Sequence, residues 1–498
     1  MSFYVALVSF ILSIVLFPHQ ISGGNLTPVV KTKSGKVVGN IVPTSEGEFA
    51  QFLGIPYAKP PIGSLRLQPT KPVDDWDDVL KATEEPNHCW QPRVNIGSKR
   101  WTLSEDCLYL NILTPTSVFD QGKSKLLPVI VSLGTSYSFD FAESHEFEKT
   151  AYPFVLRENI IDVIVRYRLG FFGFPYSSNE KDGIISNLGL WDQNMALHWI
   201  KDNIKSFGGD PDRVTIVGTG GGGGLVDAHL YSPYARGLFQ NSVTESRQVI
   251  GLFSFDTNTL PTEESTNIVI DRVGCGKAKD KIACLQDLDP KTIVSSYPNR
   301  QFAFNPTPDG EYIPLDYESQ PPNGENHLRG FVEDLGSFPS IPFAPEIFTK
   351  QDFALEDARD VISRIYEGDS VDKITNLYIG SATDDLSLKK IQEGLIRFLT
   401  DIFYACPAFL AAEFIAEGQT RGKTYVFQFN HMPNSHLFPV CDLQNELRGC
   451  YLNIRIFTSG LPFVDSPQVF NWKDIFTPQD RMVSEKMIRI LGNFVKSG

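Results

Sequence analysis

The sequence predicts an α/β fold in which one large, mostly parallel sheet is flanked by helices. Three apolar runs bounded by turn residues support this: LPVIVSL (127–133), IIDVIVRY (160–167) and RVTIVG (213–218). Continuous Val, Ile and Leu runs are typical of strands covered on both faces. Between the last two runs, 190–207 spaces its large apolar residues at helical intervals. A strand, a helix and another strand in this order predict a parallel crossover unit.

Composition indicates a globular chain and makes some classes of binding partner improbable. Of the 498 residues, 42% are hydrophobic and 21% are charged, the balance of a protein with a large buried core. The net charge is −14 and no segment is rich in Lys and Arg, so we expect neither a nucleic-acid partner nor an anionic membrane surface. Cationic partners suit this overall charge better. The length alone would permit more than one domain.

The N-terminal residues are typical of a secreted protein. Residues 3–17 form an unbroken apolar run followed by Pro18. A bilayer span needs about 20 residues, so we predict a signal peptide over 1–24. An uncleaved anchor is the alternative, because no basic residue precedes the run. No later segment is predicted to span a membrane. The mature chain, 25–498, begins at Asn25, which starts the only N-x-S/T sequon and is a predicted glycosylation site.

Seven cysteines suit an oxidising compartment. Three pairs enclose short loops: Cys89 with Cys107, Cys275 with Cys284, and Cys441 with Cys450. Cys406 is then left over, which indicates a partner outside this chain or a missing segment. The alternative is that some of these cysteines are free and buried.

Five stretches occur in the order found in one known family. They are FLGIPYAKPPIGSLRL (52–67), SEDCLYLNI (104–112), YRLGFFGF (167–174), 187–218 and SPYARGLFQNSV (232–243). Together they resemble the type-B carboxylesterase and cholinesterase family over nearly the whole chain. The resemblance implies the α/β-hydrolase fold as one domain over 25–498, with a deep gorge above the sheet. It also implies disulfides Cys89–Cys107 and Cys275–Cys284, and a structural pairing of Arg168 with Glu105.

The family's nucleophile position is occupied here by glycine. In the family, the strand that matches 213–218 leads into a G-x-S-x-G elbow, where a sharp turn exposes a serine. Here the turn reads Gly218-Thr219-Gly220-Gly221-Gly222, with Gly220 at the serine position. A glycine has no oxygen with which to form an acyl-enzyme. Thr219 is adjacent, but we expect its side chain to leave the turn in another direction.

The other catalytic positions are altered as well. Where the family has a glycine-rich oxyanion loop, this chain has Gly134, Thr135, Ser136 and Tyr137. Leu335 stands at the acid's position, beside Glu333 and Asp334. The window 448–463 contains no histidine; Tyr451 is the best match, and His431 and His436 lie upstream. Nucleophile, base, acid and oxyanion donors act as one unit, so we predict no measurable esterase turnover.

The glycine run 220–224 allows a second interpretation. Gly218 to Gly223 fits G-x-G-x-x-G after a strand, which is the pattern of a dinucleotide or phosphate site. A glycine run satisfies this pattern trivially, so we predict no cofactor, and we predict no metal. Glycines also disfavour helix by about 0.8–1 kcal/mol each, so we expect an irregular first turn in the following helix.

Three functions remain open from the sequence. The first is an extracellular recognition or adhesion module with a protein partner, as in the family's non-catalytic members. The second is a carrier or scavenger that holds an apolar small molecule in the retained gorge. The third is an ester hydrolase with a relocated triad. The chain ends just after a predicted helix, 481–498, where relatives continue, so we expect that the usual C-terminal end is missing.

Overall fold

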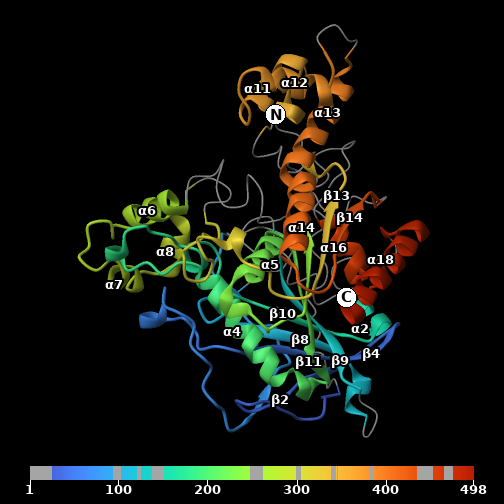
Figure 1. Cartoon of the computed structure of the whole chain (residues 1–498). Coiled ribbons are helices and arrows are strands. Elements are labelled where there is room, and N and C mark those ends of the chain that lie inside the picture. The colour runs from blue at the N-terminus through green and yellow to red at the C-terminus, as the bar shows by residue number, and fades with distance from the viewer. Residues whose placement is uncertain are drawn as a thin grey trace, which may run out of the picture.

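The computed structural model describes residues 25–92, 102–120, 125–136, 151–246, 262–298, 304–337, 344, 346–350, 352–381, 386–433, 452–464 and 475–498. The predicted signal peptide, Cys441, Cys450, His436, Tyr137 and Tyr451 lie outside these ranges. Within them, a nine-stranded sheet runs through the centre of the main body (Figure 1). Its strands, from one edge to the other, are β14 (Thr424–Phe429), β13 (Asn326–Val332), β12 (Asn241–Glu245), β11 (Gly209–Gly220), β9 (Leu127–Ser136), β10 (Ile161–Val165), β8 (Tyr109–Pro115), β4 (Gly47–Pro56) and β3 (Asn40–Thr44).

The sheet is mostly parallel, as predicted. The six strands from β14 to β10 pair in parallel, while β8, β4 and β3 continue the sheet antiparallel. The three apolar runs noted in the sequence are β9, β10 and β11, and β9 lies between the other two. Two small sheets lie outside the main one: β1 (Val30–Lys31), β2 (Lys36–Val38) and β5 (Val79–Lys81), and β6 (His88–Cys89) with β7 (Leu103–Ser104).

Helices cover both faces of the sheet. They are α2 (Tyr152–Glu158), α3 (Gly170–Gly173), α4 (Leu188–Asn203), α5 (Gly221–Tyr231), α6 (Thr262–Arg272), α7 (Lys281–Gln286), α8 (Pro290–Ser295), α10 (Glu346–Thr349), α11 (Leu355–Ser363), α12 (Asp369–Tyr378), α13 (Leu388–Thr400), α14 (Cys406–Gly418), α16 (Leu452–Ser459) and α18 (Pro478–Ser497). Figure 1 shows α4 and α5 on one side of the sheet and α2, α16 and α18 on the other. The predicted helices 190–207 and 481–498 are α4 and α18.

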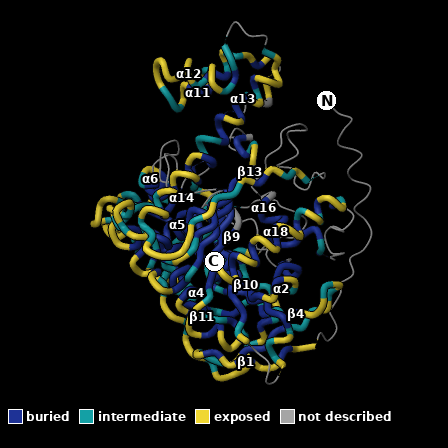
Figure 2. The backbone as a smooth tube through the Cα atoms, turned by 45° about the vertical axis from the view of Figure 1, so that its right-hand side comes forward, coloured by how far each residue is buried: buried dark blue, intermediate teal, exposed yellow. Residues whose placement is uncertain are grey.

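Alternate side chains of the central strand β9 pack into two different apolar cores, one on each face of the sheet. Val129, Val131 and Leu133 of β9 pack into the core beneath α4 and α5. Ile130, which points the opposite way, packs with Ile488 of α18. Both faces are apolar because both are covered, which is why the runs read as continuous Val, Ile and Leu. Figure 2 shows the resulting concentration of buried backbone along the sheet.

A small helical lobe formed by α11, α12 and α13 stands apart from the main body at the top of Figure 1. It has its own apolar cluster, which includes Val361, Ile379 and Leu395. A π-helical segment, Asp401–Ala405, joins α13 to α14, so the helix runs on from the lobe into the main body.

That continuous helix bears on one expectation. Leu388–Gly418 spans 31 residues and contains an 18-residue window with a mean hydropathy of 1.5, so by length and composition it could cross a membrane. The prediction that no later segment spans a membrane therefore overlooked a candidate, and it stays a prediction. However, 61% of its apolar window is buried inside the protein, as in the core helix of a globular domain.

Candidate functional site

The turn predicted after β11 has the geometry of a strand-to-helix elbow. β11 ends at Gly220, and α5 begins at Gly221 without a linker. Gly220 has φ 58° and ψ −123°, a conformation that residues with a side chain rarely adopt. The tip of the elbow is therefore sharp, and it carries no side chain.

The following glycines permit close backbone packing. A Cβ on Gly222 would lie 2.1 Å from the carbonyl oxygen of Gly134, and one on Gly218 would lie 2.0 Å from that of Gly222. α5 is regular from Gly221 onward, so the expectation of an irregular first turn was wrong. Contact between α5 and the end of β9 compensates for the low helix propensity of glycine. Since this first turn is buried against protein, it does not present open N–H groups to a phosphate.

The oxyanion-loop position is part of a paired strand. β9 continues to Ser136, and its end lies in register with the elbow: Thr135 opposite Thr219 and Ser136 opposite Gly220. Gly134 has φ 92°, and the neighbouring Leu133 carbonyl accepts a 3.0 Å hydrogen bond from the hydroxyl of Tyr167. These contacts hold the segment as an extension of the sheet.

Thr219 points into the protein below the elbow. Its Oγ1 donates a 2.5 Å hydrogen bond to Oε2 of Glu245, at the end of β12. Oε1 of the same carboxylate accepts a 3.3 Å hydrogen bond from Thr458 of α16. Burial raises the pKa of Glu245, against opposing effects of Arg455 and of the two hydroxyl groups. The only hydroxyl within the elbow is thus bonded to a buried carboxyl group and faces away from the tip.

Arg455 of α16 extends this network across the underside of the sheet. Its Nη2 donates a 3.0 Å hydrogen bond to Oγ of Ser132 and lies 3.8 Å from Oδ2 of Asp162. Ser132 in turn donates to Oδ1 of Asp162 at 2.9 Å. These residues are almost fully buried, and the ion pair of Arg455 with Asp162, together with its electrostatic effect on Glu245, offsets the cost of burying their charges. Sequence reasoning missed this network, although a Glu at the end of an apolar strand and an Arg within NIRIF could have indicated it.

Leu335, at the predicted acid position, is fully buried in the short 3₁₀ helix Leu335–Ser337. It packs in an apolar cluster with Phe331, Tyr404 and Phe457. The next residue anchors the turn to α13: the N–H of Gly336 donates a 2.8 Å hydrogen bond to Oγ1 of Thr400. The carboxylates beside it take different positions, since Glu333 is exposed and Asp334 adopts φ 57°.

Two described histidines, His431 and His327, have partners other than a residue of the elbow. Nε2 of His431 lies 2.7 Å from Oδ1 of Asp480, whose other oxygen caps the start of α18 at Thr477. Nδ1 of His327 on β13 lies 2.8 Å from Oγ of Ser242 on β12. This Ser–His contact resembles half of a triad, yet both residues are at most 1% exposed. Burial lowers the pKa of His327 to about 3, and no substrate could reach its serine.

Structural ion pairs beneath the site differ from the expected pairing. Arg168 binds Asp192, with Nη2 to Oδ1 at 2.7 Å, and Glu105 binds Arg66 at 2.6 Å. The pairing of Arg168 with Glu105 was therefore wrong. Asp192 lies at the start of α4 and reaches Arg168 with both carboxylate oxygens, which satisfies a fully buried charge better than a single contact.

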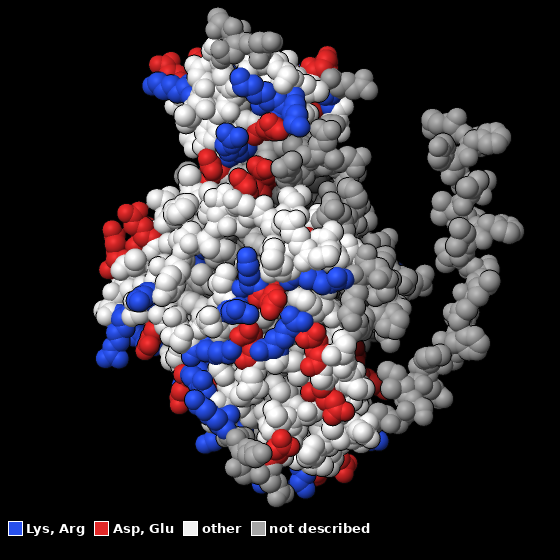
Figure 3. All heavy atoms as spheres, turned by 90° about the vertical axis from the view of Figure 1, so that its right-hand side faces the viewer, with Lys and Arg blue, Asp and Glu red and all other residues white. Residues whose placement is uncertain are grey.

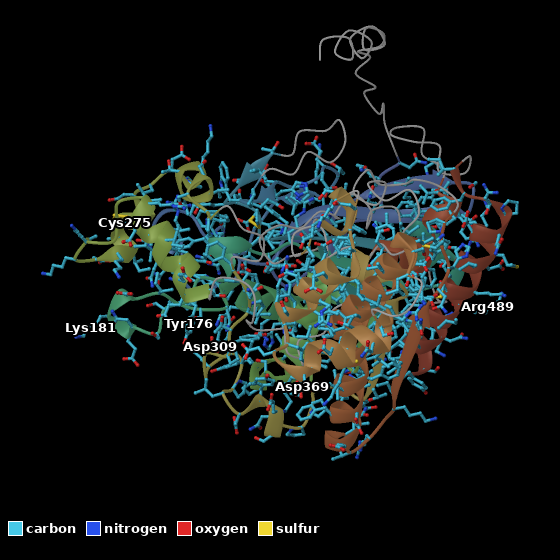
Figure 4. All side chains as sticks on the ribbon, turned by 90° about the horizontal axis from the view of Figure 1, so that it is seen from above. Tyr176, Lys181, Cys275, Asp309, Asp369 and Arg489 are labelled. Carbon is cyan, nitrogen blue, oxygen red and sulfur yellow. A yellow bond between two sulfur atoms is a disulfide. The ribbon has the colours of Figure 1, made fainter. Side chains whose placement is uncertain are left out.

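Two predicted disulfides are formed, Cys89–Cys107 and Cys275–Cys284. The labels in Figure 4 place Cys275 on the flank that carries α6 to α8, far from Arg489 on α18. Cys406 is a free, exposed thiol at the start of α14. Asn25 is exposed. Among the described residues, no group of three or more His, Cys, Asp or Glu could hold a metal ion.

Comparison with known proteins gives consistent matches along the whole chain. A family model described as "Carboxylesterase family" matches residues 26–498. An acetylcholinesterase from Bungarus fasciatus is 30% identical over 502 residues, covering 94% of this chain and 78% of that protein. Pyrethroid hydrolase Ces2e from Rattus norvegicus is 27% identical, covering 97% and 84%. Liver carboxylesterase 1 from Mus musculus is 28% identical, covering 95% and 86%.

Proposed function

The chain belongs to the carboxylesterase family, and we propose that it is a secreted, non-catalytic member that acts as an extracellular recognition module. The observation that carries the proposal is Gly220: the elbow has its strand, its sharp turn and its helix, but no atom at the tip that can attack a carbonyl carbon. The named relatives are an acetylcholinesterase, a pyrethroid hydrolase and a carboxylesterase, so the proposal departs from their activity.

The surroundings of the elbow support the loss of acyl transfer. Thr219 cannot replace the missing serine while its hydroxyl is bonded to Glu245 and buried. Leu335 brings no charge to the place where a carboxylate would orient a histidine. The end of β9 is paired with β11, so its backbone is part of the sheet and does not form a free oxyanion loop.

Support for secretion comes from covalent structure. Two disulfides are formed, and disulfides persist in oxidising compartments. We therefore also propose that residues 1–24 are a signal peptide and that the exposed Asn25 is glycosylated. Because the described residues of the elbow carry no nucleophile at its tip, the proposal assigns the function to the outer surface of the molecule.

Active-site labelling tests the loss of catalysis. The full-length chain, collected from the medium of expressing cells, is treated with a fluorophosphonate, which forms a covalent adduct with an activated serine. We expect no mass adduct and no hydrolysis of p-nitrophenyl butyrate above the rate in buffer, while a carboxylesterase treated in parallel is fully labelled. A stoichiometric adduct on any serine would establish a relocated nucleophile and reject the proposal.

A second experiment tests the recognition role against the carrier role. The folded chain is displayed on multivalent beads and applied to panels of cultured cells, with heat-denatured chain as the control. We expect binding that saturates and is competed by soluble chain. If no cell line binds and organic extraction of the purified protein releases an apolar compound in a 1:1 ratio, the carrier role replaces recognition.

A further inference from the structure

One surface loop of the main body, residues 309–319, is acidic and lies in a stretch without cationic side chains. Residues 301–328 contain neither Lys nor Arg. The acidic residues of this stretch are Asp309, Glu311, Asp316, Glu318 and Glu325. By contrast, the face of the molecule in Figure 3 carries Lys and Arg side chains interspersed with Asp and Glu. Figure 4 places Asp309 well away from Arg489 on α18. Residues 309–319 are named the acidic loop.

The acidic loop, all of which the structure describes, has little regular structure. Its regular element is the short 3₁₀ helix Tyr317–Ser319. A turn at Gly310, which has φ 77°, is closed by a 3.0 Å hydrogen bond from its N–H to the carbonyl of Ile313. Pro314 has no N–H with which to join a strand, and Leu315 is 75% exposed. Because few backbone hydrogen bonds hold this loop, an enzyme can fit the segment into its groove at low cost.

Tyr317 is the residue of the acidic loop that can accept a modifying group. Of the 17 tyrosines in the chain, it alone has an acidic residue on each side, Asp316 and Glu318. Both neighbours are exposed, and Tyr317 itself is partly exposed. Its hydroxyl donates a 3.3 Å hydrogen bond to Oε1 of Glu318, which is longer than the usual O–H···O distance. The phenol oxygen therefore lies at the surface, beside a carboxylate that holds it loosely.

Two nearby tyrosines each lack one of these properties. Tyr312 also follows a glutamate, but it is fully buried and its hydroxyl lies 2.9 Å from Nδ1 of His229. The ring of Tyr234 stacks on that of Tyr312 and is 45% exposed. However, no acidic residue lies within two positions of Tyr234, and Arg236 follows it. Tyr317 thus combines exposure with acidic neighbours, whereas Tyr234 provides exposure alone.

An exposed tyrosine between two carboxylates suits sulfuryl transfer, a modification made in the secretory pathway. The phenol oxygen attacks the sulfur of a nucleoside phosphosulfate, and a new O–S bond forms. The bond between sulfur and the bridging oxygen of the donor breaks, and the nucleoside bisphosphate leaves with the electron pair. Burial, followed by Glu318, raises the pKa of Tyr317 to about 12, so a base of the sulfotransferase must take the phenol proton. A basic acceptor groove attracts the flanking carboxylates and would repel Lys or Arg.

We propose that Tyr317 is O-sulfated during secretion. The proposal rests on the secretion that forms part of the proposed function, and it adds a covalent group that this function does not require. The sulfate ester would stand between Asp316 and Glu318 and give the acidic loop a further fixed negative charge. Arg side chains bind such a group through paired N–H donors, so the modified loop would be complementary to a partner surface rich in Arg.

Mass spectrometry of the full-length chain from the culture medium tests this site. Trypsin cuts after Arg300 and Arg329, so the acidic loop is recovered in one peptide, 301–329. We expect this peptide to carry an added SO₃ group in wild type and in Tyr234→Phe, and none in Tyr317→Phe. Asp316→Asn combined with Glu318→Gln keeps the phenol and removes both charges, so the modified fraction should fall at least about fivefold. A secreted wild-type chain without the group, or a group that persists in Tyr317→Phe, overturns the proposal.

Two further arms separate the possible failures. A phosphate group adds nearly the same mass, so the peptide is treated with a tyrosine phosphatase. A sulfate ester should remain, and removal of the group would overturn the proposal in favour of phosphorylation. In the other arm, chain retained inside the cells is digested in the same way. If the chain is retained but sulfated, secretion fails and the sulfation site stands; if it is secreted without the group, the site is rejected while secretion stands; a retained chain without the group rejects both.

Discussion

Replacing Gly220 by serine returns a hydroxyl to the tip of the elbow without returning a base. In the family's mechanism, a histidine removes the proton of the serine, and losing either residue alone costs about 10⁶-fold in rate. The family resemblance predicts Tyr451 at the position of that histidine, and a phenol with an ordinary pKa of about 10 cannot serve as a base near neutral pH. We therefore expect Gly220→Ser to remain without esterase activity.

The same substitution should destabilise the protein by an amount that the backbone predicts. At φ 58° and ψ −123°, a residue with a Cβ is strained by about 1–3 kcal/mol. Gly220→Ala introduces the same strain without the hydroxyl, so it is the matched control. Both variants should unfold at lower urea concentration than wild type and by similar amounts.

Fluorophosphonate labelling and urea unfolding of the three proteins measure both effects. A covalent adduct on Gly220→Ser, absent from Gly220→Ala and wild type, would show that some group activates the new hydroxyl. That outcome would refute the argument that the base is missing. Equal stability of all three proteins would instead refute the strain that we assign to the elbow.

Three other changes test the structure around the elbow. Arg455→Met leaves Glu245 buried without its nearby cation, so urea unfolding should reveal a loss of about 3–5 kcal/mol, and a loss below about 1 kcal/mol would argue against the buried network. Gly222→Ala places a Cβ 2.1 Å from a backbone carbonyl and should prevent secretion of folded protein. Gly63→Ala meets no atom within 4 Å and introduces only the strain of its φ of 55°, so it should still be secreted, with a stability lowered by about 1–3 kcal/mol. His327 has a pKa of about 3, below its ordinary value of 6.5, so the native state excludes a proton that the unfolded chain binds. Stability should be full above pH 6.5 and fall as the pH drops, by up to about 1.4 kcal/mol per pH unit for this group, and urea unfolding at pH 7 and pH 5 should show a smaller difference in His327→Gln.

The sheet could be predicted because its signals are local. Continuous Val and Ile runs report burial on both faces, and β9, β10 and β11 appear where those runs occur. The elbow could be placed through the family resemblance of the strand that precedes it, and glycine at 220 allows its tight turn. These features depend on neighbours within a few residues.

The buried charges could not be predicted in the same way, because their partners lie far away in the sequence. Glu245 meets Thr458, and Arg168 meets Asp192 where the family resemblance had suggested Glu105. The pairing of each acidic side chain with an arginine depends on how the helices cross the sheet, and the spacing of residues in the sequence does not predict how they cross. Similarly, the regular first turn of α5 results from contact with the end of β9, which outweighs the low helix propensity of glycine.

Gly220 also explains how the elbow can persist without a catalytic serine. In an active enzyme, the serine at this turn is held in a strained conformation, and the surrounding fold must compensate for that strain. Glycine adopts φ 58° at no steric cost, so its presence stabilises the same turn relative to serine. Under the proposed function, in which acyl transfer is lost, glycine at this position gives the native state a lower free energy than serine would, and the sheet, helices and ion pairs around the elbow are retained. Under the proposed function, the change at the tip of the elbow therefore removes the nucleophile and stabilises the turn at the same time.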